Sequence, residues 1–297
     1  MNRSLDVSLA QLDVAPLAPA ENGARMLEIA TAEARAGAGL IVFPELCNTG
    51  YVEPLAPGQG YPSGSASHAD YARRLHAAAA APDDDLIQAL AAQAERYRCH
   101  LVAGLAMRSA SRPGVLYNAS LLLGPDGQRA CYAKAHLWHN EKLFFSPGRS
   151  LPVSDIGAAR LGMQVCYDIR FPEITRCLAL AGAELVTNVW ASFRHAEEPV
   201  EDDGLFRHRA YTRAQENGVF FLSCNRVGRQ GDMRFMGRSL VARPDGRILA
   251  ALDHEKPGVL RTSLDLDEVA TYRMSTGILN DRRPELYRPL ADPEPLP

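Results

Sequence analysis

The sequence predicts an α/β protein, a four-layer αββα sandwich with two internally similar halves. Stretches typical of strands alternate with stretches typical of helices along the chain. Two kinds of segment recur in the same order in both halves. Hydrophobic residues make up 46% of the 297 residues, enough for a large core. Two halves that each carry one sheet and outer helices bury both sheets when these pack face to face.

Local patterns justify the individual elements. Apolar or alternating runs predict strands at residues 5–14, 39–45, 100–107, 159–165 and 219–225. Amphipathic patterns and end signals predict helices at residues 21–37, 83–98 and 207–218. The first helix ends at Gly37 and the third at Asn217-Gly218. The middle helix begins with acidic residues and ends with basic ones, as the helix dipole favours.

An internal repeat supports the two halves. ARAGAGLIVFPE (34–45) is similar to ALAGAELVTNVW (179–190), and both read as a helix end, a turn and a buried strand. LLLGPDGQRACYA (121–133) is similar to LVARPDGRILAAL (240–252), and both place a Pro-Asp-Gly turn between apolar strands. Because the two pairs keep their order, we interpret them as a duplication; a chance match of small residues is the alternative.

Composition argues against several classes of protein. The net charge of -3 gives no electrostatic case for binding nucleic acid or an anionic membrane. The N-terminus has no long apolar segment of a signal peptide, and no apolar run approaches a membrane span. The six cysteines are dispersed, without a C-x-x-C pair, which argues against a zinc ribbon or a disulfide framework. We expect a cytoplasmic protein.

Cys166 lies where a predicted strand ends and a helix begins. The apolar run 159–165 precedes it, and Phe171-Pro172-Glu173 reads as a helix start. The partial positive charge of a helix N-terminus favours a thiolate, which is the reactive form of cysteine. A buried structural cysteine is the alternative.

Two other polar residues end predicted strands. Glu45 follows the run LIVFP, and Lys134 lies in RACYAKAHLW at the end of a hairpin strand. A carboxylate, an ammonium and a thiol together can perform acyl chemistry, because the carboxylate takes the thiol proton and the cation stabilises an oxyanion. A partly buried ion pair with a structural role is the alternative for Glu45 and Lys134.

Three segments carry a resemblance to a known family. FPE at 43–45, YAKAHLW at 132–138 and CYDIRFPE at 166–173 resemble, in order and separation, the signature segments of the nitrilase superfamily, the carbon-nitrogen hydrolases. The resemblance implies the αββα, nitrilase-like fold, with residues 1–275 as a single domain. It further implies that the tail, residues 276–297, packs at the interface of a homodimer or higher homo-oligomer.

The resemblance also implies the site. Glu45 is the general base, Lys134 stabilises the tetrahedral intermediate, and Cys166 is the nucleophile. Glu141, in HNEKLFFSPG, matches a second glutamate that holds the lysine, and the backbone N–H of Tyr167 donates to the oxyanion. The implied reaction hydrolyses a small linear amide to an acid and ammonia through a thioester. It needs no metal and no organic cofactor.

The substrate is less defined. Tyr167-Asp168 follows the nucleophile where true nitrilases have Trp-Glu, so the chain resembles the amidase and carbamoyl-amidase branches. An N-carbamoyl substrate is the nearer alternative, and a nitrilase or a non-catalytic scaffold is less favoured. We expect aromatic residues near the catalytic segments to line the pocket, namely Tyr51, Trp138, Phe145, Trp190 and Phe193. Arg170 either meets a substrate carboxylate or pairs with Asp168 or Glu173, and the ion pair is slightly favoured.

Three further segments permit other interpretations. His136 and His139, with Cys131 nearby, have a spacing that zinc can use, but a further ligand is not evident. The acidic run EEPVEDD (197–203) and the basic run RHRAYTR (207–213) read as a mixed-charge surface or a loop over the pocket entrance. The tail segment NDRRPELYRPL (280–290) is a candidate dimer contact. Asn225, in SCNRVG, reads as structural.

Overall fold

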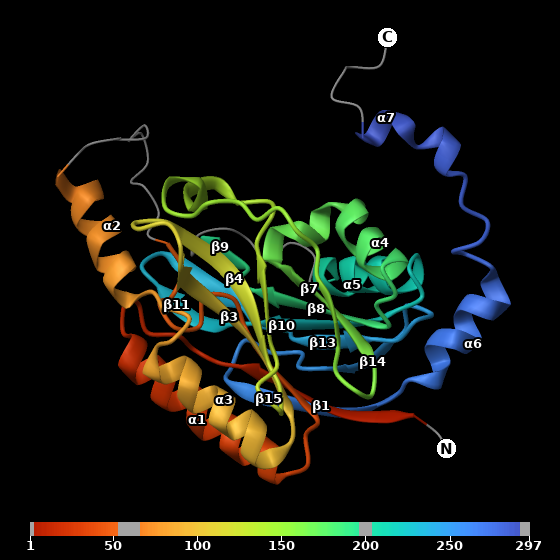
Figure 1. Cartoon of the computed structure of the whole chain (residues 1–297), viewed down its shortest axis with the longest axis horizontal. Coiled ribbons are helices and arrows are strands. Elements are labelled where there is room, and N and C mark those ends of the chain that lie inside the picture. Colours follow the sequence, from red (N-terminus) through yellow and green to blue (C-terminus); the bar gives the residue numbers. More distant parts are fainter. Residues whose placement is uncertain (1–2, 53–65, 196–203, 292–297) are drawn as a thin grey trace.

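The computed structural model of the protein describes residues 3–52, 66–195 and 204–291. Two six-stranded sheets pack against each other, and helices cover their outer faces (Figure 1). The predicted four-layer αββα arrangement is therefore confirmed. The acidic run 197–203 lies outside the described residues. No described helix is both long enough and apolar enough to cross a membrane.

The first sheet has the strand order β15-β1-β2-β3-β4-β5. Its strands are β1 (Ser4–Gln11), β2 (Leu40–Phe43), β3 (His100–Arg108), β4 (Leu116–Leu123), β5 (Arg129–Ala133) and β15 (Gly258–Asp265). The second sheet has the order β14-β13-β10-β8-β7-β6. Its strands are β6 (Val153–Asp155), β7 (Arg160–Val165), β8 (Leu185–Trp190), β10 (Phe220–Asn225), β13 (Leu240–Ala242) and β14 (Ile248–Ala251).

A small sheet and the helices complete the fold. The small sheet joins β9 (Phe193–His195), β11 (Val227–Gln230) and β12 (Met233–Met236). The α-helices are α1 (Pro19–Arg35), α2 (Ala66–Ala78), α3 (Asp85–Tyr97), α4 (Pro172–Leu180), α5 (Leu205–Gln215), α6 (Asp267–Thr276) and α7 (Arg288–Ala291). Short 3₁₀ helices are η1 (His139–Leu143), η2 (Cys166–Arg170) and η3 (Pro284–Leu286).

The two sheets have matching topology, which confirms the internal similarity. In the first, β1, β2 and β3 are parallel and the hairpin β4–β5 follows. In the second, β7, β8 and β10 are parallel and the hairpin β13–β14 follows. The two structural halves are β1–β6 and β7–β15, because β6 follows the hairpin β4–β5 as β15 follows the hairpin β13–β14. Each sheet ends in an antiparallel strand from the other half, since β15 pairs with β1 and β6 pairs with β7. The exchanged edge strands tie the halves together.

The core is layered as the alternation of side chains requires. In β2, Leu40 and Val42 lie in the cluster between the sheets, whereas Ile41 and Phe43 pack toward α1 and α3. All four are buried, because a parallel strand in this position is covered on both faces. A third cluster joins the outer face of the second sheet to α4 and α5.

The predicted elements are found, with ends that shift by a few residues. The predicted strand 5–14 is β1, and the predicted helix 21–37 begins two residues earlier, at Pro19. In the first Pro-Asp-Gly turn, Asp126 and Gly127 have φ of 59° and 74°, as a type I′ hairpin turn requires. The hairpin predicted from this turn is therefore confirmed, since β4 and β5 pair antiparallel on either side of it.

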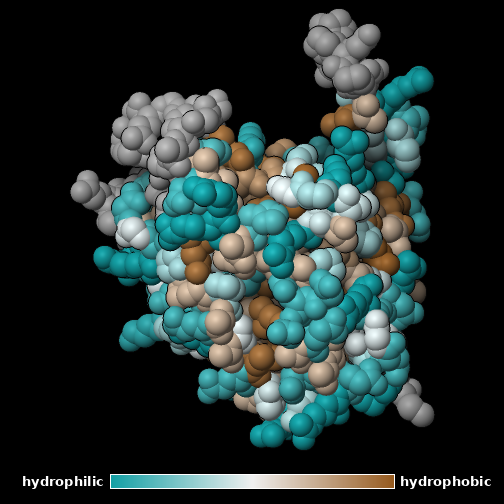
Figure 2. Space-filling view, turned by 60° about the vertical axis from the view of Figure 1, so that its left-hand side comes forward, coloured by the Kyte–Doolittle hydropathy of each residue, from teal (hydrophilic) through white to brown (hydrophobic). Residues whose placement is uncertain are grey.

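The C-terminal arm, residues 277–291, leads away from the sandwich and carries η3 and α7 (Figure 1). Leu286 and Leu290 are 63% and 71% exposed, and Met274 at the end of α6 is 78% exposed. The face in Figure 2 is otherwise mostly hydrophilic, with apolar side chains in small groups, some of them next to this arm. Such exposed apolar residues are typical of surfaces that contact another protein.

Candidate active site

Three strand ends carry the candidate residues. Glu45 follows β2, Lys134 follows β5, and Cys166 follows β7. By the topology, β2 is equivalent to β8 and β1 to β7. Glu45 and Cys166 therefore follow strands that are not equivalent, and the residue equivalent to Glu45 is Trp190. These two meet across the sheets, where the Glu45 N–H donates to the Trp190 carbonyl at 3.2 Å.

Lys134 lies between two carboxylates. Its Nζ is 2.7 Å from Glu45 Oε1 and 2.8 Å from Glu141 Oε1, and all three side chains are fully buried. Asn118 Nδ2 donates to the same Glu45 oxygen at 2.7 Å, and the Tyr51 hydroxyl donates to Glu141 Oε1 at 2.7 Å. The second Glu45 oxygen, Oε2, is buried and has no hydrogen-bond partner among the described residues. Glu45 is thus held by one oxygen and open at the other.

Burial and charge set the protonation of this cluster. Burial alone lowers the pKa of Lys134, but the negative charges of Glu141 and Glu45 outweigh it and raise that pKa well above its ordinary value. Burial raises the pKa of Glu141, and the charge of Glu45 raises it further against the opposing charge of Lys134. The lysine is therefore a firmly held cation.

Cys166 begins η2 and stands in strained backbone. Its φ is 47°, in the left-handed region that non-glycine residues rarely adopt. Burial raises the pKa of its thiol well above the ordinary value, and the charge of Glu45 adds to this, while Lys134 opposes it. The resting group is therefore the thiol, and a thiolate needs a nearby base. Strain of this kind is characteristic of functional sites.

Asp168 anchors the turn that carries Cys166. Its Oδ2 accepts the Tyr132 hydroxyl at 2.7 Å and the Val165 N–H at 3.1 Å. Its Oδ1 accepts a hydrogen bond from the backbone N–H of His136 at 3.0 Å and lies 2.9 Å from Nδ1 of the His136 ring. The buried carboxylate thereby ties η2 to the segment after β5, so the turns that carry Cys166 and Lys134 are fastened to each other.

Several aromatic side chains lie around η2. Trp138 and Tyr167 are in ring contact, with centroids 4.5 Å apart, and Tyr167 meets Phe171 at 5.2 Å. The Arg170 guanidinium lies 4.8 Å from the Trp138 ring and 5.4 Å from the Tyr167 ring. No ion pair joins Arg170 to a described carboxylate, Asp168 and Glu173 included, so the favoured ion-pair interpretation of Arg170 is not what the structure shows.

The other expected pocket residues fall into two groups. Tyr51 and Phe193 are in ring contact at 5.4 Å, close to Glu141. Phe145 and Trp190 are buried in hydrophobic clusters, and Trp190 packs on Phe206 of α5 at 5.1 Å. That these residues line a substrate pocket stays a prediction. Asn225 bridges Ser192 and Gly237 through its side-chain amide, as expected of a structural residue.

Three supporting residues have no clear signal in the sequence. Asn118 is a polar residue on the apolar strand β4, which is the one clue it offers. Gly104 in β3 allows the backbone of Pro44 and Glu45 to approach, since a Cβ there would meet Glu45 Cα at 2.5 Å. Gly148 likewise allows close approach to Ala133, and its N–H donates to the Lys134 carbonyl at 2.9 Å.

We expect Gly104→Ala to displace Glu45. The neighbouring atoms are backbone and cannot move aside cheaply, so overpacking costs roughly 1–3 kcal/mol of unfolding free energy. A shift of about 1 Å at the base lowers turnover by up to ~10²-fold. Urea unfolding and steady-state kinetics measure both effects. Gly258→Ala in β15, where the nearest atom to the added Cβ is 3.6 Å away, is the matched control and changes neither. Normal kinetics for Gly104→Ala contradicts the positioning role.

We expect stability to fall at alkaline pH. Burial raises the pKa of Tyr51, Tyr132, Cys47 and Cys224 above their ordinary values. Above about pH 9 the unfolded chain releases these protons while the folded chain retains them, so the free energy of unfolding decreases as pH rises. Each group contributes at most about 1.4 kcal/mol per pH unit. Urea unfolding between pH 7.5 and 10.5 measures this, and Tyr132→Phe reduces the slope. A flat profile contradicts it.

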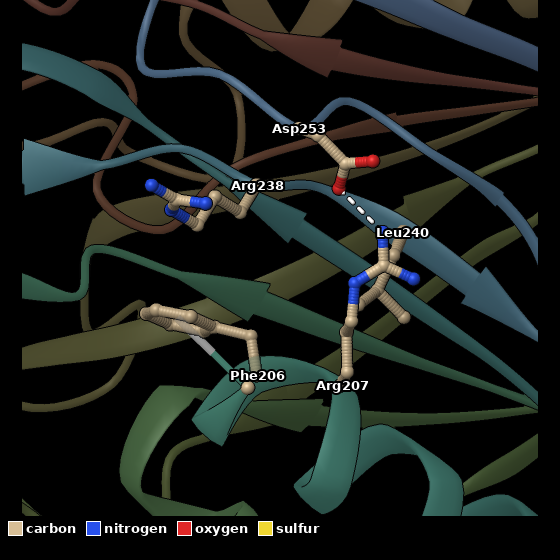
Figure 3. A pocket seen from close by; sticks show the side chains of 6 residues that line it. Phe206, Arg207, Arg238, Leu240 and Asp253 are labelled. Atoms are coloured by element: carbon tan, nitrogen blue, oxygen red, sulfur yellow. Dashed lines mark hydrogen bonds and ion pairs between the residues drawn. The ribbon is translucent and has the colours of Figure 1, made fainter. Parts of the chain in front are cut away.

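Two other features lie outside this cluster. No group of three or more His, Cys, Asp or Glu among the described residues is arranged to hold a metal ion, and Cys131 is on β5 while His139 begins η1. A cavity of about 320 Å³ beside α5 is lined by Phe206, Arg207, Arg238 and Asp253 among others. Figure 3 shows the Arg207–Asp253 ion pair in this cavity. None of the candidate catalytic side chains lines the cavity.

Known proteins match this arrangement. The carbon-nitrogen hydrolase family model matches residues 6–274. An (R)-stereoselective amidase from Pseudomonas sp. is 34% identical over 247 residues, 82% of this chain and 79% of that protein. The 2-oxoglutaramate amidase of Bacillus subtilis is 30% identical over 289 residues, 95% of this chain and 98% of that protein.

Solved structures agree. The crystal structure of an amidase from Nesterenkonia sp. is similar with a TM-score of 0.74 and 29% identity, covering 97% of both chains. A glutamate-to-glutamine mutant of that amidase shows covalent addition of the acetamide moiety of fluoroacetamide at the active-site cysteine. The family match over most of the chain, the shared fold and the full-length relatives lead to one conclusion: this protein is an enzyme of the carbon-nitrogen hydrolase family, the nitrilase superfamily, in its amidase and carbamoyl-amidase branch.

Proposed function

We propose that the protein hydrolyses a small linear carboxylic amide to the acid and ammonia, through a thioester on Cys166. One observation carries the proposal. Glu45 is held through Oε1 by Lys134 and Asn118, while its buried Oε2 has no partner among the described residues. A carboxylate fixed in this way is suited to take a proton from the thiol, whose raised pKa reflects burial first and the charge of Glu45 next.

The chemical steps follow from these positions. Glu45 accepts the Cys166 proton, and the thiolate attacks the amide carbon. The oxyanion is stabilised by the Lys134 ammonium and by the N–H of Tyr167, which lies in the first turn of η2 where amides lack partners within the helix. Glu45 returns the proton to the leaving nitrogen and ammonia departs. Glu45 then deprotonates a water, which attacks the thioester, releases the acid and restores the thiol.

Glu141 acts on Lys134 in this scheme. It binds Nζ and is itself held by the Tyr51 hydroxyl and by the Trp138 N–H, at 2.7 and 3.1 Å. With one oxygen of each glutamate on the ammonium, the cation has a fixed position and one remaining N–H donor. Fixed donors that need no reorganisation are the main source of oxyanion stabilisation in such sites. The named amidases among the relatives support the substrate class.

A panel of substrates tests the reaction. Ammonia release is measured from linear amides, N-carbamoyl amino acids and nitriles, with and without hydroxylamine. We expect release from linear amides, and with hydroxylamine we expect the acyl group to appear partly as the hydroxamate, because hydroxylamine intercepts a thioester. Release chiefly from carbamoyl compounds, with carbon dioxide, replaces this proposal by a carbamoyl amidase. Turnover of amides without any hydroxamate contradicts the thioester.

We further propose that residues 1–275 act as one domain and that the tail, residues 276–297, packs against a second copy in a homodimer or larger homo-oligomer. The exposed Leu286 and Leu290 support this, since a second copy would cover them. Sedimentation at micromolar concentration should give at least a dimer, and Leu286→Glu with Leu290→Glu should shift it toward the monomer. A monomeric wild type rules the interface out.

We also propose that the protein is cytoplasmic. All six cysteines are free, which supports this location.

A further inference from the structure

We propose that Gln230 is a positioning residue of the active site, which fixes the Tyr51 hydroxyl on Glu141 and, through Glu141, the Lys134 ammonium. The inference rests on the proposed function, in which Lys134 stabilises the oxyanion. It gives a role to the small sheet, none of whose strands carries a candidate catalytic residue. Gln230 ends β11, and nothing in the surrounding sequence VGRQGD distinguishes it.

The Gln230 side chain binds both backbone groups of Tyr51. The Tyr51 N–H donates to Gln230 Oε1 at 3.0 Å, and Gln230 Nε2 donates to the Tyr51 carbonyl at 2.6 Å. Both residues are buried, with 4% and 7% of their surface exposed. A side-chain amide supplies one acceptor and one donor here, as a neighbouring strand does in a ladder. Gln230 therefore fixes the backbone of Tyr51 in position and in direction.

Arg226, which directly precedes β11, holds Gln230 in turn. Its Nη1 donates to Gln230 Oε1 at 3.3 Å, and its Nη2 donates to the Val14 carbonyl at 2.8 Å. The guanidinium is fully buried and lies 3.8 Å from the centroid of the Phe235 ring in β12. A guanidinium that is stacked on a ring and bound at two nitrogens has little freedom to move. The Gln230 amide therefore has a fixed location.

The fixed backbone directs the Tyr51 ring toward Glu141. The ring contacts Phe193 in β9 and Phe235 in β12, with centroids 5.4 and 6.3 Å apart. The hydroxyl donates to Glu141 Oε1 at 2.7 Å, and the same oxygen accepts a hydrogen bond from Lys134 Nζ at 2.8 Å. A displaced ring would therefore loosen the atom that holds the lysine. Hydrogen bonds between buried groups thus connect β11 with Lys134.

The Tyr51 hydroxyl also affects the charge of Glu141. The titratable groups that face this carboxylate are Lys134 after β5, Glu45 after β2, Cys166 at the start of η2 and Tyr51 itself. Burial raises the pKa of Glu141, the charge of Lys134 lowers it, and the charge of Glu45 raises it again. The hydrogen bond from Tyr51 lowers this pKa, so its loss raises the pKa of Glu141 further.

Kinetics of Gln230→Met and Tyr51→Phe test the positioning role. Methionine keeps the length of the side chain without its amide, and phenylalanine lacks only the hydroxyl. We expect each substitution to lower kcat on the best amide by about tenfold or more and to leave KM unchanged, because Lys134 acts on an oxyanion that the bound substrate lacks. In the double variant the two losses should not multiply, since Gln230 acts through the hydroxyl that Tyr51→Phe removes.

Gln128→Met is the matched control. Gln128 lies in the turn before β5, and its Nε2 also donates to a backbone carbonyl, that of Asp155 at 2.6 Å. This variant should keep the kcat of wild type. Two kinetic results overturn the proposal. A raised KM with unchanged kcat would make Tyr51 and Gln230 part of the substrate pocket wall, and losses that multiply fully would show that Gln230 does not act through the hydroxyl.

Urea unfolding at pH 5 and pH 8 tests the same connection without a substrate. In folded Tyr51→Phe, the pKa of Glu141 lies further above its unfolded value than in wild type. The loss of unfolding free energy relative to wild type should therefore be larger at pH 8 than at pH 5. Gln230→Met should show the same increase, whereas any loss in Gln128→Met should be equal at the two pH values.

The two measurements separate this proposal from the proposed function. A loss in Gln230→Met that is equal at pH 5 and pH 8 overturns the positioning role. If the loss increases with pH but wild type hydrolyses no amide, the proposed function fails and the positioning role stands. If Gln230→Met hydrolyses amides with the kcat of wild type, the proposed function stands and the positioning role fails.

Discussion

Cys166→Ala is expected to lower kcat/KM on the amide that wild type turns over best by at least about 10³-fold, since it removes the covalent nucleophile. Glu45, Lys134 and Glu141 support the reaction of the Cys166 sulfur, and without that sulfur no thioester forms. The fold should persist, because the hydrogen bond from the Val165 N–H to Asp168, which closes the turn around Cys166, does not use the thiol. Ammonia release and urea unfolding of the same preparations measure the two parts. Cys177→Ala, an exposed cysteine on α4, is the matched control.

The strained backbone at Cys166 adds a second readout. At a φ of 47°, alanine retains the steric penalty that glycine lacks. Cys166→Gly should therefore be more stable than Cys166→Ala, by about 1 kcal/mol or slightly more, although both are inactive. Substantial turnover by Cys166→Ala would remove the nucleophile assignment. Equal stability of the two variants would show that the conformation stores no strain.

The fold was predictable because its signals are local and repeated. The segments 34–45 and 179–190 became β2 and β8, which hold equivalent places in the two sheets. The Pro-Asp-Gly turns became the β4–β5 and β13–β14 hairpins. The exchange of β6 and β15 between the halves was not predicted, since neither strand carries a signal of which sheet it joins.

The candidate site was predictable where a residue type itself carries chemistry. Glu45 and Lys134 are charged residues just after strand ends, and Glu141, which the family resemblance implied, lies in η1. The structure places Lys134 Nζ 2.7 Å from Glu45 Oε1 and 2.8 Å from Glu141 Oε1. Asn118 and Gly104 act through partners far away in the chain. Their roles depend on which strand or helix packs beside them, and no local pattern records that.

Lys134→Met is expected to cost about 3–5 kcal/mol of unfolding free energy near neutral pH and to abolish measurable turnover. The substitution leaves Glu45 and Glu141 facing each other, both fully buried, with the cation between them gone. Two buried carboxylates without a cation take up protons, so their folded pKa values rise above the unfolded values. The variant's stability should therefore decrease as pH rises above about 4.3, and its deficit against wild type should be larger at pH 8 than at pH 5.

A double variant tests this cause directly. Lys134→Met with Glu141→Gln removes one of the two repelling charges, so part of the lost stability, roughly 1–3 kcal/mol, should return while activity stays absent. Lys142→Met, an exposed lysine in η1, is the matched control and should change stability by less than about 0.5 kcal/mol. If the deficit of Lys134→Met is independent of pH and Glu141→Gln adds to it, the loss comes from packing. Lys134 would then stabilise the fold through the packing of its side chain. Compensation of the two carboxylate charges would not be the reason for a lysine at this position.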